Sequence, residues 1–128
     1  MAAGASVVVV GGGVMGCSIA FHLAERGTDV LVLERGTVCS GMTARSGALV
    51  RTHYTNEPEA RMARTGLGYF QSWRERVGGW CGFTVTGAAI LVGPGDGERL
   101  RRNVAMLRRV GVDTEAVTPE QLAAEHPE

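Results

Sequence analysis

Aromatic residues, paired cysteines and net charge are the features that this 128-residue sequence has least of. Only 5% of its residues are aromatic, and 13 basic and 13 acidic residues give a formal net charge of zero. A balanced charge provides no bulk attraction for nucleic acid or an anionic membrane, so we expect neither as a partner. The three cysteines, Cys17, Cys39 and Cys81, form no CxxC pair, which argues against zinc and disulfide frameworks. We therefore expect no metal site and a reducing, cytoplasmic location.

Charged side chains are also missing from residues 2–24, which contain no Lys, Arg, Asp or Glu. An uncharged stretch of this length also occurs in signal peptides and membrane spans. Here, however, no positively charged side chain precedes the apolar run, and the sequence GGG at 11–13 interrupts it. The pattern instead favours a buried strand followed by a buried helix, in a soluble α/β domain that is 45% hydrophobic.

The first 34 residues have the pattern of a strand, a helix and a second strand. The run SVVVV at 6–10 is apolar and β-branched, which is typical of a parallel strand covered on both faces. Residues 14–26 are predicted to form a helix that ends at Gly27, and DVLVLE at 29–34 predicts the second strand. Together they predict a βαβ unit of the Rossmann type.

Further elements are predicted along the rest of the chain. Asn56 is a suitable N-cap for a helix that continues to about residue 77. Thr118 and Gln121 have the spacing of a capping box, which predicts the start of another helix. Between them we expect two strands over 81–93 around a turn at Thr86-Gly87, an amphipathic helix over 95–111 whose arginines face solvent, and a short strand over 115–117.

The motif with the clearest chemical meaning is GGGVMG, which places Gly11, Gly13 and Gly16 in the spacing GxGxxG. It follows a predicted strand and opens a predicted helix, as a dinucleotide fingerprint requires. Gly11 permits the tight turn, Gly13 allows close approach of a pyrophosphate, and Gly16 allows the helix to pack on the strand. The N–H groups of the first helical turn, including those of Val14 and Met15, are then available to phosphate.

An acidic residue ends the second predicted strand, 18 residues after Gly16. The carboxylate of Glu34 is placed to accept both hydroxyls of an adenosine ribose, and its charge argues against the 2′-phosphate of NADP. NAD and FAD share this fingerprint, so the motif alone leaves both open. A glycine-rich turn in an ordinary α/β domain is the remaining alternative.

The sequence as a whole resembles the FAD-dependent amine and amino-acid oxidoreductases of the glycine, sarcosine and D-amino-acid oxidase type. The likeness begins in VVVVGGGVMGCSIAFHLAERGTDVLVLERG and continues into SGMTARSGALVRTHY, where it is most similar to sarcosine oxidase β-subunits. GGWCGFTVTGAAILVG and TPEQL also fit this pattern. The resemblance implies a glutathione-reductase-like FAD-binding unit over 1–80 and the beginning of an α+β substrate domain over 81–128.

The resemblance also implies roles for the loop that follows Glu34. In such enzymes this loop runs along the flavin side of FAD and presents hydroxyls and backbone N–H groups to the cofactor. An arginine followed three places later by a tyrosine, as in Arg51 and Tyr54, helps hold the substrate carboxylate. Arg45 stands where dimethylglycine dehydrogenases have a flavin-linked histidine, so we expect no attachment through a histidine in the 38–54 loop. The cofactor-binding candidates in and beside this loop are Arg35, Ser40, Gly41, Thr43, Ser46 and Gly47.

Family members are about three times this length, so the resemblance implies that the chain is the N-terminal part of a larger enzyme, inactive by itself. The full enzyme is expected to oxidise the C–N bond of a small amine or amino acid, sarcosine- or glycine-like, by hydride transfer to flavin. Two alternatives remain at this point. The chain could be a non-catalytic nucleotide-binding chain, alone or completed by a partner subunit, or part of an NAD-linked dehydrogenase.

Overall fold

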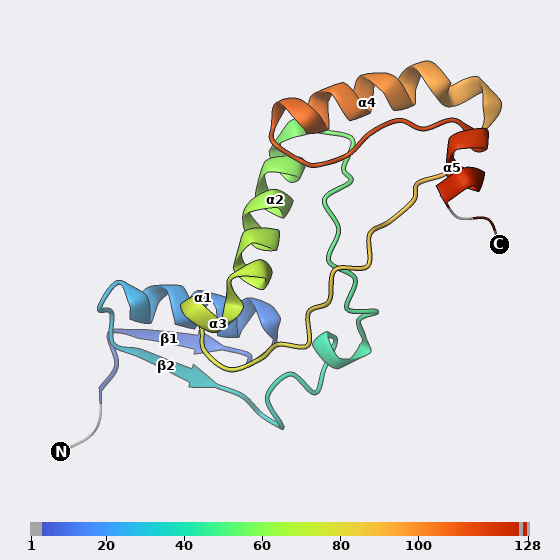
Figure 1. Ribbon diagram of the computed structural model, residues 1–128. Helices are drawn as coiled ribbons and strands as arrows, with labels where there is room; N and C mark the ends of the chain where they lie inside the picture. The colour runs from blue at the N-terminus through green and yellow to red at the C-terminus, as the bar shows by residue number, and fades with distance from the viewer. Residues whose placement is uncertain (1–3, 126, 128) are drawn as a thin grey trace. The chain divides into compact units, whose positions relative to one another are not determined.

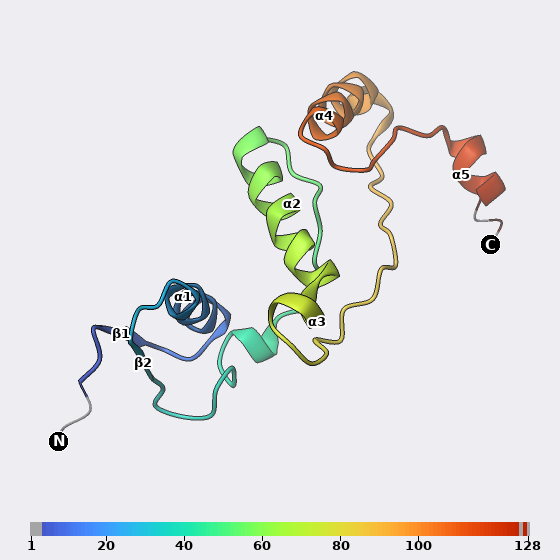
Figure 2. The same ribbon diagram turned by 60° about the vertical axis from the view of Figure 1, so that its left-hand side comes forward.

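Residues 4–125 and 127 are described by a computed structural model (Figures 1 and 2). They fall into two units, Met1–Leu49 (unit 1) and Val50–Glu128 (unit 2), each considered by itself below. This division differs from the predicted domain boundary at 80/81, which concerns cofactor and substrate binding and stays a prediction. Within the described residues, no helix has both the length and the apolar character needed to cross a membrane.

Unit 1 is a βαβ unit, as the sequence predicts. Strands β1 (Val7–Val10) and β2 (Val30–Leu33) are parallel, with Val7 opposite Val30 and Val10 opposite Leu33. Helix α1 (Val14–Glu25) connects them and packs on both strands (Figure 1). As expected, Gly27 follows its C-terminal end: the φ of this residue, 76°, is left-handed, and its N–H donates to the Ala24 carbonyl.

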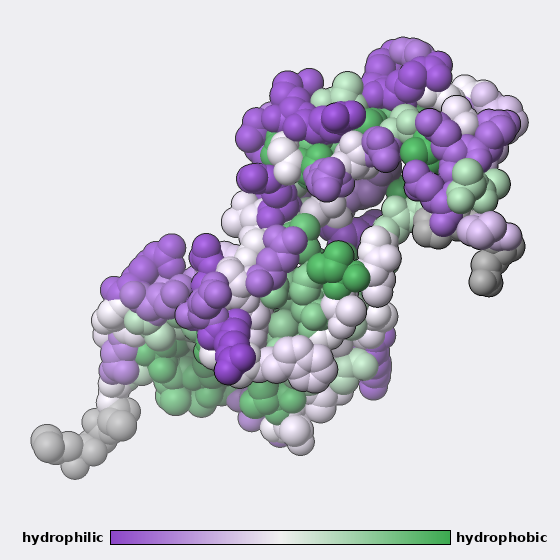
Figure 3. Space-filling view, in the orientation of Figure 1, coloured by the Kyte–Doolittle hydropathy of each residue, from purple (hydrophilic) through white to green (hydrophobic). Residues whose placement is uncertain are grey.

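The expected burial of both sheet faces is not met within this unit. Side chains alternate along each strand between half-buried and exposed. Val8, Val10, Leu31 and Leu33 are the exposed set, and Val10 retains 84% of its accessible surface. Figure 3 shows the resulting apolar surface in green over the strands. A single crossover helix covers one face of a parallel sheet, so the second face has no cover within unit 1.

Unit 2 begins with helix α2 (Glu57–Gln71), and the predicted cap forms. Asn56 Oδ1 accepts from the Glu59 N–H at 3.0 Å, while the Glu59 carboxylate accepts from Asn56 Nδ2 at 2.7 Å. The predicted helix to about residue 77 forms with one interruption, at Ser72. There the Ser72 hydroxyl and the Ser72 N–H both donate to the Gly68 carbonyl, at 2.6 and 3.1 Å, and such a hydroxyl back-bond often bends a helix. A separate turn, α3 (Trp73–Arg76), follows.

The core of unit 2 lies where α2 meets helix α4 (Gly97–Arg109). Ala60, Leu107, Val110 and Val112 are buried together, and Tyr54 packs against them. Glu57 accepts from Arg61 within α2 at 2.7 Å and, across the contact, from Arg109 of α4 at 3.1 Å, so one arginine of the predicted arginine face of α4 is paired. The three short remaining elements are η1 (Thr43–Arg45, in unit 1), η2 (Pro94–Asp96) and α5 (Pro119–Glu125).

Two predicted β segments do not form, whereas the last predicted helix does. The segment 81–93 is extended without ladder bonds, although Gly87 has the left-handed φ of 73° that a turn needs. Residues 115–117 are likewise not a strand. Strands need partners, and within the described residues neither segment has one. Helix α5 begins as expected: the Thr118 hydroxyl accepts from the Gln121 N–H at 3.2 Å, and the Gln121 side chain accepts from the Thr118 N–H at 2.8 Å.

Candidate dinucleotide-binding site

The glycine motif forms the turn between β1 and α1 in the way that its spacing predicts. Gly11 has a φ of 106°, which side-chain-bearing residues rarely adopt. A Cβ on Gly16 would lie 1.9 Å from the Gly11 carbonyl oxygen and 3.4 Å from Val9 Cγ1, so the absence of a side chain lets the helix approach the strand. Gly13 caps α1 without a side-chain hydrogen bond.

The start of α1 is held by a residue from the loop after β2. Thr43 Oγ1 accepts from the Val14 N–H at 3.0 Å and so supplies the cap that Gly13 lacks. A Cβ on Gly13 would come within 3.2 Å of the same oxygen. In the described part of the chain, the N–H groups of Gly13, Met15 and Gly16 have no protein acceptor. Together with the helix dipole, these groups form a site suited to an anion.

Replacing the Thr43 hydroxyl tests its role as the cap of α1. Thr43→Val removes the acceptor but keeps the shape of the side chain, so we expect the free energy of unfolding to fall by about 1 kcal/mol. Thr43→Ser keeps the oxygen and should stay within about 0.5 kcal/mol of the native chain. Urea unfolding followed by circular dichroism measures both. Equal stability of the two variants would show that the hydroxyl does not cap the helix.

Glu34 lies beside the glycine turn, as the motif requires. Its Oε2 accepts from the Gly12 N–H at 2.7 Å, and its Oε1 accepts from the Gly36 N–H at 2.8 Å. The bond from Gly12, followed by that from Gly36, holds the pKa of the Glu34 carboxyl below its usual range, so the group is ionised at neutral pH. An ionised carboxylate has about four acceptor positions. Two are occupied here, which leaves capacity for a diol.

A pocket of about 320 Å³ opens between the glycine turn and the loop after β2. Six of the sequence-predicted residues line it: Gly13, Glu34, Arg35, Ser40, Gly41 and Thr43. Gly11, Val14, Met15 and Gly16 shape the turn and the helix start beside it. Ser46 and Gly47 are not among its lining residues; Ser46 Oγ instead accepts from the Ala48 N–H at 3.1 Å. For all of these residues, contact with a cofactor stays a prediction.

Four residues of this site were not predicted from the sequence. Gly12 binds Glu34 through its N–H, and Gly36, Cys39 and Met42 line the pocket. Cys39 has a φ of 63°, a left-handed conformation that costs a residue with a side chain about 1–2 kcal/mol. Only the position of Gly12 inside the motif was visible in the sequence. The other three depend on how the loop folds back, which the sequence pattern does not specify.

Arg51 and Tyr54, the predicted substrate residues, belong to unit 2. The guanidinium carbon of Arg51 lies 5.3 Å from the centroid of the Tyr54 ring, a cation–π contact that orients the side chain. Tyr54 also packs on the unit 2 core. His53, between them, forms a hydrogen bond of 3.2 Å with the Asn103 side chain. The pair is therefore an ordered feature of unit 2, and its role in binding a carboxylate stays a prediction.

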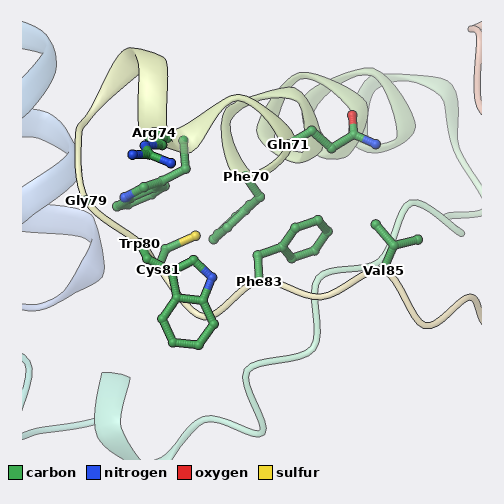
Figure 4. Close-up of a pocket in the computed structure, with 9 residues that line it drawn as sticks. Phe70, Gln71, Arg74, Gly79, Trp80, Cys81, Phe83 and Val85 are labelled. Atoms are coloured by element: carbon green, nitrogen blue, oxygen red, sulfur yellow. The ribbon is translucent and has the colours of Figure 1, made fainter.

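A larger hollow, of about 570 Å³, lies in unit 2, and four of the nine residues that line it are aromatic (Figure 4). Phe70 stacks on Trp73 at 5.8 Å between ring centroids and contacts Phe83 at 5.6 Å. These contacts hold the extended segment after Gly79 against the end of α2. Trp80 remains 84% exposed. The hollow offers apolar surface but no set of groups suited to binding phosphate.

The sequence profile of the family described as FAD dependent oxidoreductase matches residues 6–128. The chain belongs to this family. Its members depend on FAD, the cofactor that the resemblance implied. The L-proline dehydrogenase from P. horikoshii superposes with a TM-score of 0.80 and 28% sequence identity, over 96% of this chain and 33% of the other. The α/β fold with a Rossmann-type FAD-binding unit is thereby confirmed.

Two curated relatives extend the comparison. The mitochondrial pyruvate dehydrogenase phosphatase regulatory subunit of Mus musculus is 31% identical over 125 residues, which are 96% of this chain and 14% of that protein. Gamma-glutamylputrescine oxidoreductase of Escherichia coli is 45% identical over 51 residues, 40% of this chain and 12% of the relative. The chain thus spans well under a quarter of the length of either relative.

The residues of this family member fit the dinucleotide part of FAD. The start of α1 presents to a pyrophosphate N–H groups that have no acceptor among the described residues, and Gly13 carries no side chain that would block it. Glu34 is ionised and has acceptor capacity left for a ribose. The Thr43 hydroxyl accepts from Val14, and its hydrogen can still be donated to a phosphate oxygen.

Proposed function

We propose that this FAD-dependent oxidoreductase chain binds the adenosine diphosphate half of FAD in the unit 1 pocket. The observation that carries the proposal is the convergence of Glu34, the Gly12 N–H and Thr43 at the start of α1. In the proposed complex the pyrophosphate lies on the N–H groups of Gly13, Met15 and Gly16, and the ribose hydroxyls donate to Glu34. The negative charge of Glu34 disfavours a 2′-phosphate. Ser40, Gly41, Ser46 and Gly47 would contact more distant parts of the cofactor.

For the whole protein we propose oxidation of the C–N bond of a small amine or amino acid, sarcosine- or glycine-like. FAD, when bound, would supply the acceptor for a hydride from the carbon next to the amine nitrogen. Names of relatives support this class of substrate: an E. coli protein is a gamma-glutamylputrescine oxidoreductase, and the solved P. horikoshii protein is an L-proline dehydrogenase. A cytoplasmic location belongs to the same proposal.

Arg51 would bind the substrate carboxylate in this proposal. A guanidinium binds a carboxylate through two parallel hydrogen bonds and stays charged at all relevant pH values. The contact with the Tyr54 ring restricts the side chain of Arg51 before substrate arrives, which lowers the entropy lost on binding. The proposed role requires a substrate that carries a carboxylate in addition to its amine.

A second candidate is a regulatory chain that binds FAD without oxidising a substrate, alone or with a partner subunit. The observation that favours it is the mouse relative, a regulatory subunit that matches 96% of this chain. Under this proposal the unit 1 pocket would still bind FAD, but Arg51 would have no substrate to hold. Amine-dependent bleaching of the bound flavin therefore separates the two candidates.

Flavin reduction in the full-length protein tests the enzymatic proposal. We expect a yellow protein that sarcosine-like amino acids bleach under anaerobic conditions. Arg51→Gln should raise the KM for an amino-acid substrate roughly 10- to 100-fold and leave that for an amine without a carboxylate unchanged, because only the former loses a charged hydrogen bond. Arg99→Gln, on the exposed surface of α4, is the control. A colourless protein would contradict FAD binding, and a yellow one that no amine bleaches would favour the regulatory candidate.

A further inference from the structure

Two cysteines of unit 1 meet at one backbone oxygen beside the pocket. The Cys17 thiol donates to the Gly12 carbonyl at 3.4 Å, and the Cys39 N–H donates to the same oxygen at 2.9 Å. Cys17 lies in the first turns of α1, whereas Cys39 lies in the loop after β2. The shared acceptor brings two chain segments that are 22 residues apart in sequence to the same point.

The surroundings of the two sulfur atoms differ. Cys39 lines the 320 Å³ pocket, so a small molecule in the pocket reaches it. Cys17 is half-buried, as Cys39 is, but it does not line the pocket, and its thiol donates to the Gly12 carbonyl. Burial raises the pKa of the Cys17 thiol, and the neighbouring Cys39 thiol and the Glu34 carboxylate raise it further. The thiol of Cys17 is therefore protonated at neutral pH, whereas Cys39 is the cysteine that lines the pocket.

We propose that Cys17 and Cys39 are a site of reversible oxidation, at which hydrogen peroxide converts the two thiols to a disulfide beside the dinucleotide pocket. Such a bond would join the loop after β2 covalently to the start of α1. The shared Gly12 carbonyl loses its thiol donor in the process but keeps the Cys39 N–H.

The reaction balances with one peroxide molecule. The Cys39 thiolate attacks a peroxide oxygen, the O–O bond breaks, and the released hydroxide takes a proton and leaves as water, which gives a sulfenic acid. The Cys17 thiol then gives up its proton as its sulfur attacks the Cys39 sulfur, and that proton joins the hydroxide that leaves. The S–S bond forms, the S–O bond breaks, and a second water leaves. Two thiols lose two protons and two electrons, and the peroxide oxygens are reduced to water.

Tryptic mapping of the peroxide-treated 128-residue chain identifies the bond directly. Cleavage after arginine places each cysteine in its own peptide, because Cys17 lies in 1–26, Cys39 in 36–45 and Cys81 in 77–99. We expect the peptides 1–26 and 36–45 to appear linked under non-reducing conditions, with the loss of two hydrogen atoms, and to separate after reduction. The same treatment in guanidinium should give a mixture of all three pairings.

Two cysteine variants test which residues form the link. Cys81→Ser should leave the link unchanged, and Cys39→Ser should abolish it. Since native chain suffices for the mapping, the result does not depend on whether a variant folds. A link through Cys81 in the native chain, over-oxidation of Cys39 without a link, or no reaction at peroxide concentrations that oxidise free cysteine would each overturn the proposal.

A further experiment, which rests on the proposed FAD site, measures the rate of disulfide formation with FAD present. Its outcome is independent of the peptide mapping. If FAD occupies the pocket, it covers Cys39, so saturating FAD should slow formation of the link at least 10-fold, while riboflavin, which has no pyrophosphate, should not. A link that forms at the same rate with FAD would contradict the proposed cofactor position and leave the disulfide site established. Absence of the link without FAD would contradict the disulfide site alone.

Discussion

Gly16→Ala is expected to destabilise unit 1 by more than about 3 kcal/mol, beyond the usual cost of overpacking a core. The added Cβ would lie 1.9 Å from the Gly11 carbonyl oxygen, a backbone atom that no change of rotamer can move. Relief requires α1 to move away from β1, which also displaces the N–H groups that face the pocket. Urea unfolding and limited proteolysis of unit 1 measure the effect.

Gly47→Ala is the matched control for this substitution. It lies in the same unit, and a Cβ there meets nothing within 4 Å. We expect its free energy of unfolding to remain within about 0.5 kcal/mol of the native value. If Gly16→Ala were as stable as Gly47→Ala, the close packing of α1 on the glycine turn would be contradicted, and with it the position of the proposed phosphate site.

Glu34→Gln is expected to weaken FAD binding roughly 10- to 100-fold, since hydrogen bonds to a charged group contribute about 1.5–3 kcal/mol each. The amide keeps the size of the side chain but loses the charge and one acceptor oxygen. In the native chain the Gly12 and Gly36 N–H groups donate to the Glu34 carboxylate at 2.7 and 2.8 Å. The variant places an NH₂ group beside one of these two N–H groups. Flavin fluorescence during titration measures the affinity.

A second variant and a second ligand are the controls for Glu34→Gln. Glu59→Gln, on the exposed first turn of α2, removes an equal charge from unit 2 and should leave FAD affinity unchanged. Riboflavin lacks the adenosine ribose, so its affinity should be the same for native chain and Glu34→Gln. Equal loss of affinity for FAD and riboflavin would show that Glu34 supports the fold of the pocket and does not bind the ribose.

The pH dependence of FAD binding follows from the Glu34 pKa. Its value is lowered in the folded chain, mainly by the Gly12 N–H, so the carboxylate stays ionised below the usual carboxyl range near about 4.3. Affinity should therefore be constant at neutral pH and fall only as the pH drops through the lowered value. The two backbone bonds stabilise the fold over the same range, and that contribution is also lost on acidification. Glu34→Gln should show neither change.

Unit 1 was largely predictable from the sequence because its signals are local. The run at 6–10 predicts β1, Gly27 ends α1 in the expected left-handed conformation, and Glu34 ends β2 beside the glycine turn. Local chemistry also predicts the caps at Asn56 and Thr118. In these cases the residue that determines an element lies within a few positions of it; only the approach of Glu34 to Gly12, 22 residues away, depends on the pairing of β1 with β2.

The remaining features depend on contacts between distant segments. Thr43 was expected to face the cofactor, but its hydroxyl also caps α1 from 29 residues away. The segment 81–93 has the composition of two strands, yet it stays unpaired because composition does not supply a neighbouring strand. The helix is interrupted at Ser72, although its apolar pattern continues beyond that residue.

The measurement that tests the central claim most directly is the change in backbone amide NMR shifts when FAD is added to the ¹⁵N-labelled chain. We predict saturable shifts of the Gly13, Met15 and Gly16 amides and of the loop residues that line the pocket, with FAD but not with riboflavin. Shifts confined to unit 2, or the same shifts with riboflavin, would contradict a pyrophosphate bound at the start of α1.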